Sequence, residues 1–63
     1  MAYEIKNIRL EKHMTQEELA LASGVSRATI SGLENGTIKI TTTATLLKIA
    51  DALGKKVSDI FLD

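Results

Sequence analysis

The sequence contains no cysteine, no proline and no tryptophan, and its aromatic residues are one tyrosine and one phenylalanine. Without cysteine the chain can form no disulfide, no thiolate zinc site and no thiol nucleophile. No apolar run approaches the length that a membrane span requires. The segment from Met1 to His13 is charged throughout, which argues against a signal peptide. We therefore expect a cytoplasmic protein.

The chain also has no excess of positive or negative charge, because eight basic and eight acidic residues give a formal net charge of zero. A strong non-specific nucleic-acid binder is usually basic, so this balance argues against that class. It leaves specific binding open, since the placement of the charges decides it. A chain of 63 residues, 44% of them hydrophobic, suits one small domain over residues 1–63. Its core must be aliphatic.

The segment from Thr15 to Gly36 carries signals for two short helices joined by a tight turn. A capping box starts the first helix, and a glycine that tolerates positive φ ends it. A serine caps the second helix, and an Asn-Gly pair stops it. In chain order these signals are Thr15 with Glu18, Gly24, Ser26, and Asn35-Gly36. Two such helices form a helix-turn-helix unit, whose second helix enters the DNA major groove.

The same segment, with its helix-turn-helix over about residues 15–35, contains motifs that carry a family resemblance. They are Thr15-Gln16-x-x-Leu19-Ala20, Gly24-Val25-Ser26, Ile30-Ser31-x-Leu33-Glu34, and Gly36. In this combination the segment resembles the helix-turn-helix family of phage Cro and repressor proteins, which includes restriction-modification controllers and antitoxins. The resemblance extends more weakly over nearly the whole chain. It implies an all-α fold, a compact five-helix lambda-repressor-like domain.

Hydrophobic spacing places the other three helices. We expect them over about Tyr3 to Lys12, from Thr42 or Thr43 to Leu53, and over about Val57 to Leu62, where Ser58 is the candidate cap. The β-branched segment 37–41 is predicted to be an extended loop. Leu10 and Leu21 fall outside the buried faces, either as scattered exposed leucines or as part of a partner surface.

Arg9 shares the apolar face of the first helix, where a lone buried charge would be very costly. The resemblance implies that Arg9 pairs with Glu34, near the end of the second helix-turn-helix helix. The alternative is a surface arginine whose alkyl stem covers apolar neighbours while its head stays in water.

The predicted DNA contacts come partly from helical spacing and partly from the resemblance. Ile30 and Leu33 point inward, so the opposite side of that helix should face the groove. The resemblance implies base reading at Arg27, Ala28 and Gly32. The family usually has a long polar or basic residue in place of Gly32, and a glycine there can make no side-chain readout. It implies phosphate contacts near the ends of both helices. The predicted DNA-binding residues are Gln16, Ser26, Arg27, Ala28, Thr29, Ser31, Gly32, Asn35 and Lys39.

The expected function is that of a transcriptional regulator, most simply a repressor that binds a pseudo-palindromic double-stranded DNA operator as a homodimer. The apolar end Ile60-Phe61-Leu62 is the predicted dimer interface, although Ile60 also suits the core and the other two residues could lie in either place. The alternative is a protein-interaction module of the antitoxin type with weak DNA binding. No nucleophile–base pair, metal-ligand spacing or phosphate loop is visible, so we expect no enzyme activity, no cofactor and no metal.

Overall fold

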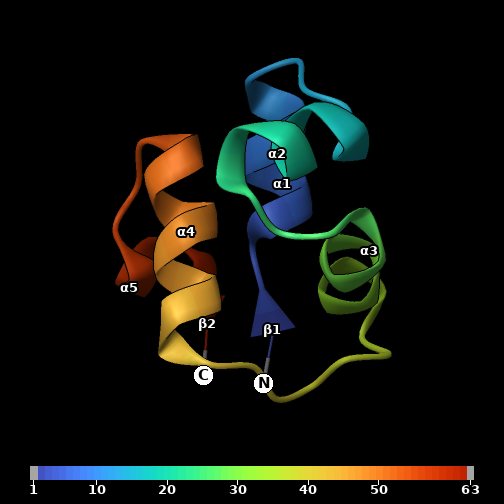
Figure 1. Cartoon of the computed structure of the whole chain (residues 1–63). Coiled ribbons are helices and arrows are strands. Elements are labelled where there is room, and N and C mark those ends of the chain that lie inside the picture. The colour runs from blue at the N-terminus through green and yellow to red at the C-terminus, as the bar shows by residue number, and fades with distance from the viewer. Residues whose placement is uncertain (1, 63) are drawn as a thin grey trace.

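The computed structural model describes residues 2–62, and Figure 1 shows a bundle of short helices whose two chain ends lie side by side. The helices are α1 (Ile5–Glu11), α2 (Gln16–Ser23), α3 (Arg27–Asn35), α4 (Thr43–Leu53) and α5 (Val57–Ile60). Two very short strands flank them, β1 (Ala2–Tyr3) and β2 (Phe61–Leu62). The all-α fold with five helices is confirmed.

Both helices of the helix-turn-helix begin at the predicted caps. The Thr15 hydroxyl accepts the N–H of Glu18 at 3.0 Å, and the Glu18 carboxylate accepts the N–H of Thr15 at 2.8 Å. Gly24 ends α2 at a φ of +74°, a conformation that side chains with a Cβ avoid. The Ser26 hydroxyl then accepts the N–H of Thr29 at 3.2 Å. These local bonds satisfy helix-end groups that would otherwise lack partners.

One aliphatic core is shared by all five helices. α2 packs against α3 and α4, α1 packs against the same two helices, and α5 packs against α4. The buried apolar residues are Ile5, Ile8, Leu19, Val25, Ile30, Leu33, Leu46, Ile49, Ala50, Leu53 and Ile60. Burial of these side chains is the main favourable term for the fold. Because Ile30 and Leu33 of α3 face this core, the opposite side of α3 is available for other contacts.

The two chain ends form a short antiparallel ribbon that the sequence analysis did not predict. Tyr3 pairs with Phe61 in its register, and the N–H of Glu4 donates to the carbonyl of Ile60 at 2.8 Å. The rings of Tyr3 and Phe61 lie 5.4 Å apart. The predictions that Tyr3 begins the first helix and that Leu62 ends the last one are therefore wrong. The pairing joins residues from opposite ends of the chain, which a local pattern does not reveal.

α5 begins at Val57 as predicted, but its cap differs from the prediction. The carboxylate of Asp59, not the hydroxyl of Ser58, caps this helix by accepting the N–H of Lys56 at 3.0 Å. The 37–41 segment is a loop, as predicted. None of the helices in the described residues is long and apolar enough to cross a membrane.

Candidate nucleic-acid interface

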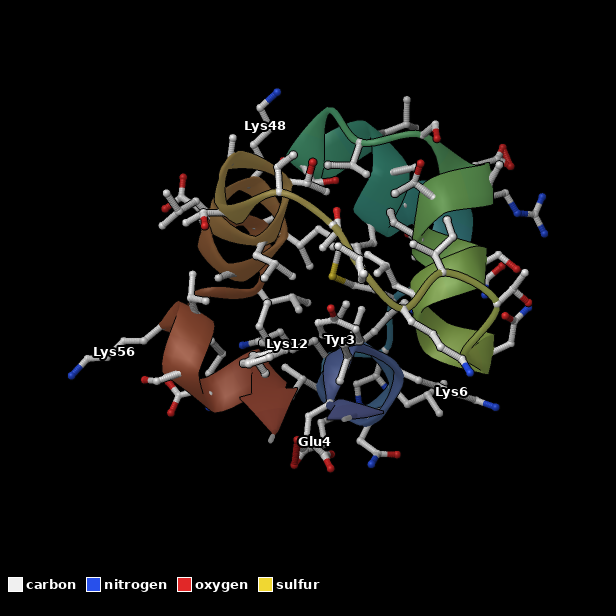
Figure 2. All side chains as sticks on the ribbon, turned by 90° about the horizontal axis from the view of Figure 1, so that it is seen from below. Tyr3, Glu4, Lys6, Lys12, Lys48 and Lys56 are labelled. Atoms are coloured by element: carbon white, nitrogen blue, oxygen red, sulfur yellow. The ribbon has the colours of Figure 1, made fainter. Side chains whose placement is uncertain are left out.

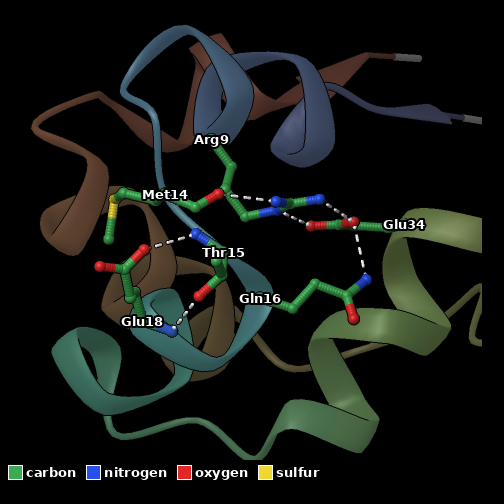
Figure 3. A network of polar contacts seen from close by, with 6 residues as sticks. All are labelled: Arg9, Met14, Thr15, Gln16, Glu18 and Glu34. Atoms are coloured by element: carbon green, nitrogen blue, oxygen red, sulfur yellow. Dashed lines mark hydrogen bonds and ion pairs between the residues drawn. The ribbon is translucent and has the colours of Figure 1, made fainter.

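A buried ion pair joins α1 to the last turn of α3 (Figure 3). Arg9 Nε donates to Glu34 Oε2 at 2.8 Å, and Arg9 Nη2 donates to Oε1 at 3.0 Å. Arg9 Nη1 donates to the carbonyl oxygen of Met14 at 2.7 Å. The side chains of Arg9 and Glu34 are only 8% and 3% exposed, which rules out the surface-arginine alternative. The pair therefore fixes α3 relative to α1 and to the turn before α2.

Gln16, the first residue of α2, joins the same network. Its Nε2 donates to Glu34 Oε1 at 3.0 Å, and its side chain is half-buried. The sequence predicted Gln16 as a phosphate contact. In the structure the Gln16 side chain also links the start of α2 to α3.

Competing effects act on the charges of this network. Burial alone would raise the pKa of Glu34, but hydrogen bonds from Arg9 and Gln16, together with the positive charges of Arg9 and Lys6, lower it below its ordinary value. The hydrogen bond to Glu34 raises the pKa of Arg9, although burial acts against this. Both groups are therefore charged at neutral pH, and each stabilises the charge of the other.

The exposed side of α3 carries most of the predicted DNA contacts. Arg27 is the first residue of this helix, and its side chain is exposed. The exposed or half-buried residues that follow it are short, so Arg27 is the long hydrogen-bond donor at this end of the helix. Of the predicted residues, Ser26, Arg27, Ala28 and Asn35 are exposed, and Thr29 and Ser31 are half-buried.

Gly32 does not belong to this exposed side, so its predicted role as a base-reading position is wrong. Gly32 is buried, and a Cβ atom built on it would lie 2.5 Å from Cδ1 and 2.6 Å from Cγ1 of Ile38. Helical spacing does place Gly32 in line with Ala28. It carries no information, however, about a side chain from the following loop that folds onto the helix.

Two lysines lie beside the exposed side of α3. Lys39, in the loop after α3, is exposed as predicted. Lys6 of α1 was not predicted; it lines a cleft of about 240 Å³ together with Gln16, Ser31 and Asn35, next to the ion pair. The signal that could have found Lys6 is its position three residues before Arg9, which puts both on one side of α1.

Other basic residues point elsewhere. Figure 2 shows Lys48 and Lys56 extending from sides of the molecule that differ from the side of Lys6. This distribution agrees with the neutral net charge, because the basic residues do not gather into one large patch. A nucleic-acid contact at α3 would therefore use few of them.

The predicted dimer interface is only partly available. Ile60 is fully buried in the core of one chain, so its assignment to the dimer interface is wrong. Phe61 is half-buried beside Tyr3, whereas the side chain of Leu62 lies outside the described side chains. Three exposed leucines also lie on the surface: Leu10, Leu21 and Leu47, which are 51%, 82% and 55% exposed. Nothing in the described contacts joins Leu10 and Leu21 into one surface.

The chain is similar to known helix-turn-helix proteins over most of its length. A family model described as helix-turn-helix matches residues 5–60. An uncharacterised HTH-type transcriptional regulator of Archaeoglobus fulgidus is 44% identical over 63 residues, which cover 98% of this chain and 86% of that protein. The HTH-type transcriptional repressor RghR of Bacillus subtilis is 42% identical over 50 residues, which cover 79% of this chain but only 37% of the repressor.

A solved structure is similar over most of both chains. The restriction-modification controller protein C.AhdI from Aeromonas hydrophila aligns with a TM-score of 0.84 at 31% sequence identity, over 92% of this chain and 86% of the controller. The arrangement of α1 to α5 is therefore shared with a protein whose sequence differs at most positions.

The ion pair should dominate the stability of the domain. We expect Glu34→Gln to lower the free energy of unfolding by about 3–5 kcal/mol, because Arg9 then stays buried without a charged partner. Urea denaturation followed by circular dichroism measures this change. Glu11→Gln, at an exposed carboxylate in α1, is the control and should change stability little. A wild-type midpoint for Glu34→Gln would contradict the structural role of the pair.

Acid should weaken the domain through the same carboxylate. Because the pKa of Glu34 is lower in the folded than in the unfolded state, its stabilising effect is complete above the unfolded pKa and is lost as the pH falls through the folded pKa. We expect the unfolding free energy to fall below about pH 5, and to fall less steeply in Glu34→Gln. Urea midpoints across this range measure the difference. Equal slopes for the two proteins would show that Glu34 does not control acid stability.

Proposed function

The chain belongs to the helix-turn-helix family and is a DNA-binding transcriptional regulator, and we propose that it is a repressor that binds a pseudo-palindromic operator as a homodimer. We further propose that it acts in the cytoplasm by binding DNA and not by catalysis. The observation that carries this proposal is the exposed side of α3, with Arg27 at its start, on a helix held from beneath by the Arg9–Glu34 pair. The relatives named as a repressor and as a controller support the same class of function.

Base reading would be concentrated at the N-terminal end of α3, where recognition helices contact base edges. The Arg27 guanidinium matches the O6 and N7 acceptors of guanine. Ala28 can offer only a methyl group, which suits the methyl of thymine. With Gly32 covered by Ile38, the helix has little else with which to read bases.

Phosphate contacts would surround this reading end. Lys39 lies on the loop after α3, and Lys6 lines the cleft between α1 and α3 with Gln16 and Asn35. Such contacts fix the register of a protein on DNA but carry no base identity. Because the basic residues are few and dispersed, we expect a shallower dependence of log K on log salt than strongly basic proteins show.

A homodimer would supply the specificity that one short helix lacks, because two half-sites about one helical turn apart are then read together. We place the contact at the α4–α5 end of the domain. Leu47 is 55% exposed there, and it lines a cleft with Val57 of α5. Val57 also lines the neighbouring cleft that Phe61 borders. The dimer surface proposed here is therefore Leu47, Val57 and Phe61.

One observation favours the alternative of an antitoxin-type interaction module, namely the net charge of zero. The two functions differ in whether this chain binds duplex DNA without a partner protein. Selection from a random duplex pool at low salt distinguishes them. An enriched pseudo-palindrome supports the repressor, and the absence of duplex binding supports the interaction module.

Arg27→Ala is the sharpest test of base reading. We expect a loss of about 1–3 kcal/mol on the selected site and a relaxed preference at one position in each half-site. Arg27→Lys should restore affinity better than selectivity, because lysine keeps the charge but lacks the planar fork. Repeating the duplex selection with each variant measures both effects.

Lys39→Ala is the matched control, because loss of a phosphate contact should weaken binding to all sequences about equally. Gln16→Ala is a poorer control, since it also removes a hydrogen bond to Glu34. An unchanged sequence preference in Arg27→Ala, with binding lowered uniformly, would show that Arg27 contacts phosphate and does not read a base.

Leu47→Glu tests the dimer. Since Leu47 is exposed in a single chain, the substitution should leave folding intact and add a carboxylate to an apolar contact. We expect sedimentation to show a dimer for the wild type at micromolar concentration or on its operator, and a monomer for the variant. Leu21→Glu, at a leucine on α2 that is 82% exposed, is the control and should keep the dimer. A wild type that stays monomeric both free and on DNA would refute the assembly.

A further inference from the structure

We propose that Gly32 is a socket for Ile38, and that this contact holds the loop after α3 in the position from which Lys39 meets a DNA phosphate. Gly32 would then be a positioning residue for backbone contacts and would have no part in reading bases. The inference rests on the proposed function for its DNA half. Its structural half concerns only how α3 holds the loop.

The contact between Gly32 and Ile38 has both a polar and an apolar part. The N–H of Ile38 donates to the carbonyl of Gly32 at 2.9 Å. The Ile38 side chain lies so close to Gly32 that an added Cβ would come within 2.5 Å of its Cδ1 and 2.6 Å of its Cγ1. Ile38 is half-buried and packs against the core. Only glycine leaves room for this approach.

Neighbouring residues of the loop are held as well. The N–H of Thr37 donates to the side-chain oxygen of Asn35 at 2.9 Å. The Tyr3 hydroxyl donates to the carbonyl of Lys39 at 3.3 Å. Tyr3 lies near the centre of the view in Figure 2. Contacts thus hold Thr37, Ile38 and Lys39 in succession.

The side chain of the next residue, Ile40, is 88% exposed. α3 holds the loop at Thr37 and Ile38, and Tyr3 of β1 holds it at Lys39. The positively charged side chain of Lys39 thus follows directly after Ile38, the residue that Gly32 holds. Two isoleucines of one loop thus have opposite surroundings, which supplies a matched pair for experiment.

The presence of glycine at this position argues for the same conclusion. Apart from proline, glycine is the least favourable residue for a helix interior, and alanine is the most favourable. Gly32 lies inside α3 and not at its end. Without the socket, Gly32→Ala should therefore raise the thermal midpoint and leave DNA binding unchanged. If Gly32 is the socket for Ile38, Gly32→Ala should instead weaken DNA binding.

The experiment compares Gly32→Ala, Ile38→Ala and the double variant, each bound to a duplex selected by the wild type and to an unrelated duplex, across a range of KCl concentrations. We expect each single variant to weaken both duplexes by a similar factor. The slope of log K against log salt should become shallower by about 1, as for one lost phosphate contact. The double variant should bind no more weakly than Ile38→Ala, because both substitutions remove the same contact.

Ile40→Ala is the matched control and should leave the salt slope unchanged, since this side chain is in solvent. Amide hydrogen exchange gives a second measurement that needs no DNA. The Ile38 N–H should exchange faster in Gly32→Ala than in the wild type, because its hydrogen bond to Gly32 is loosened.

Two outcomes would overturn the inference while leaving the proposed function intact. One is a wild-type salt slope in Gly32→Ala together with unchanged exchange at Ile38. The other is a changed base preference in Gly32→Ala, which would make this position a reader. A wild type that binds no duplex overturns the proposed function and, with it, the phosphate role of the loop. Exchange at Ile38 would then still show whether Gly32 holds the loop.

Discussion

The buried pairing of Arg9 with Glu34 is the constraint on which the placement of α3 depends. Two charges removed from water are tolerable only when each finds the other and their remaining hydrogen-bonding groups are also satisfied. Here the guanidinium reaches both carboxylate oxygens and the carbonyl of Met14, and Gln16 donates to the same carboxylate. α3 therefore cannot rotate or slide without separating a buried charge from its partner. A helix that reads DNA benefits, because its orientation is set before binding and little ordering is left to do.

This constraint divides α3 into two functional halves. Its first residues, including Arg27, have no large side chain over them and can approach a base edge. Its later residues contact the rest of the chain, through Glu34 on one side and through Gly32 and Ile38 on another. In a protein with no net charge, specific contacts at one helix end and a few well-placed phosphate contacts must replace the general attraction that a basic surface provides.

Sequence reasoning recovered the features whose causes are local. The Thr15–Glu18 capping box and the Ser26 cap need only a few consecutive residues, and both are present in the structure. The partner of Arg9 came from the family resemblance, since apolar spacing showed only that a partner was needed. Local reasoning failed once, at α5, where the carboxylate of Asp59 and not the hydroxyl of Ser58 caps the helix. The other failures involve contacts that helical periodicity does not describe. Periodicity identified the face on which Gly32 lies but not that Ile38 covers it, and it could not show that β1 pairs with β2. It left Ile60 open between the core and a dimer contact, and the structure places Ile60 in the core.

The pairing of the chain ends then links the two surfaces that the proposed function uses. β1 holds Tyr3 against Phe61, and the Tyr3 hydroxyl reaches the carbonyl of Lys39. The end of the domain proposed to meet a second copy and the loop proposed to meet a phosphate are thus joined through a single tyrosine. In so small a domain the core alone leaves little stability in reserve. The ribbon of β1 and β2 also contacts the loop through Tyr3, so a few hydrogen bonds and one aromatic contact restrict all three segments of an otherwise helical chain.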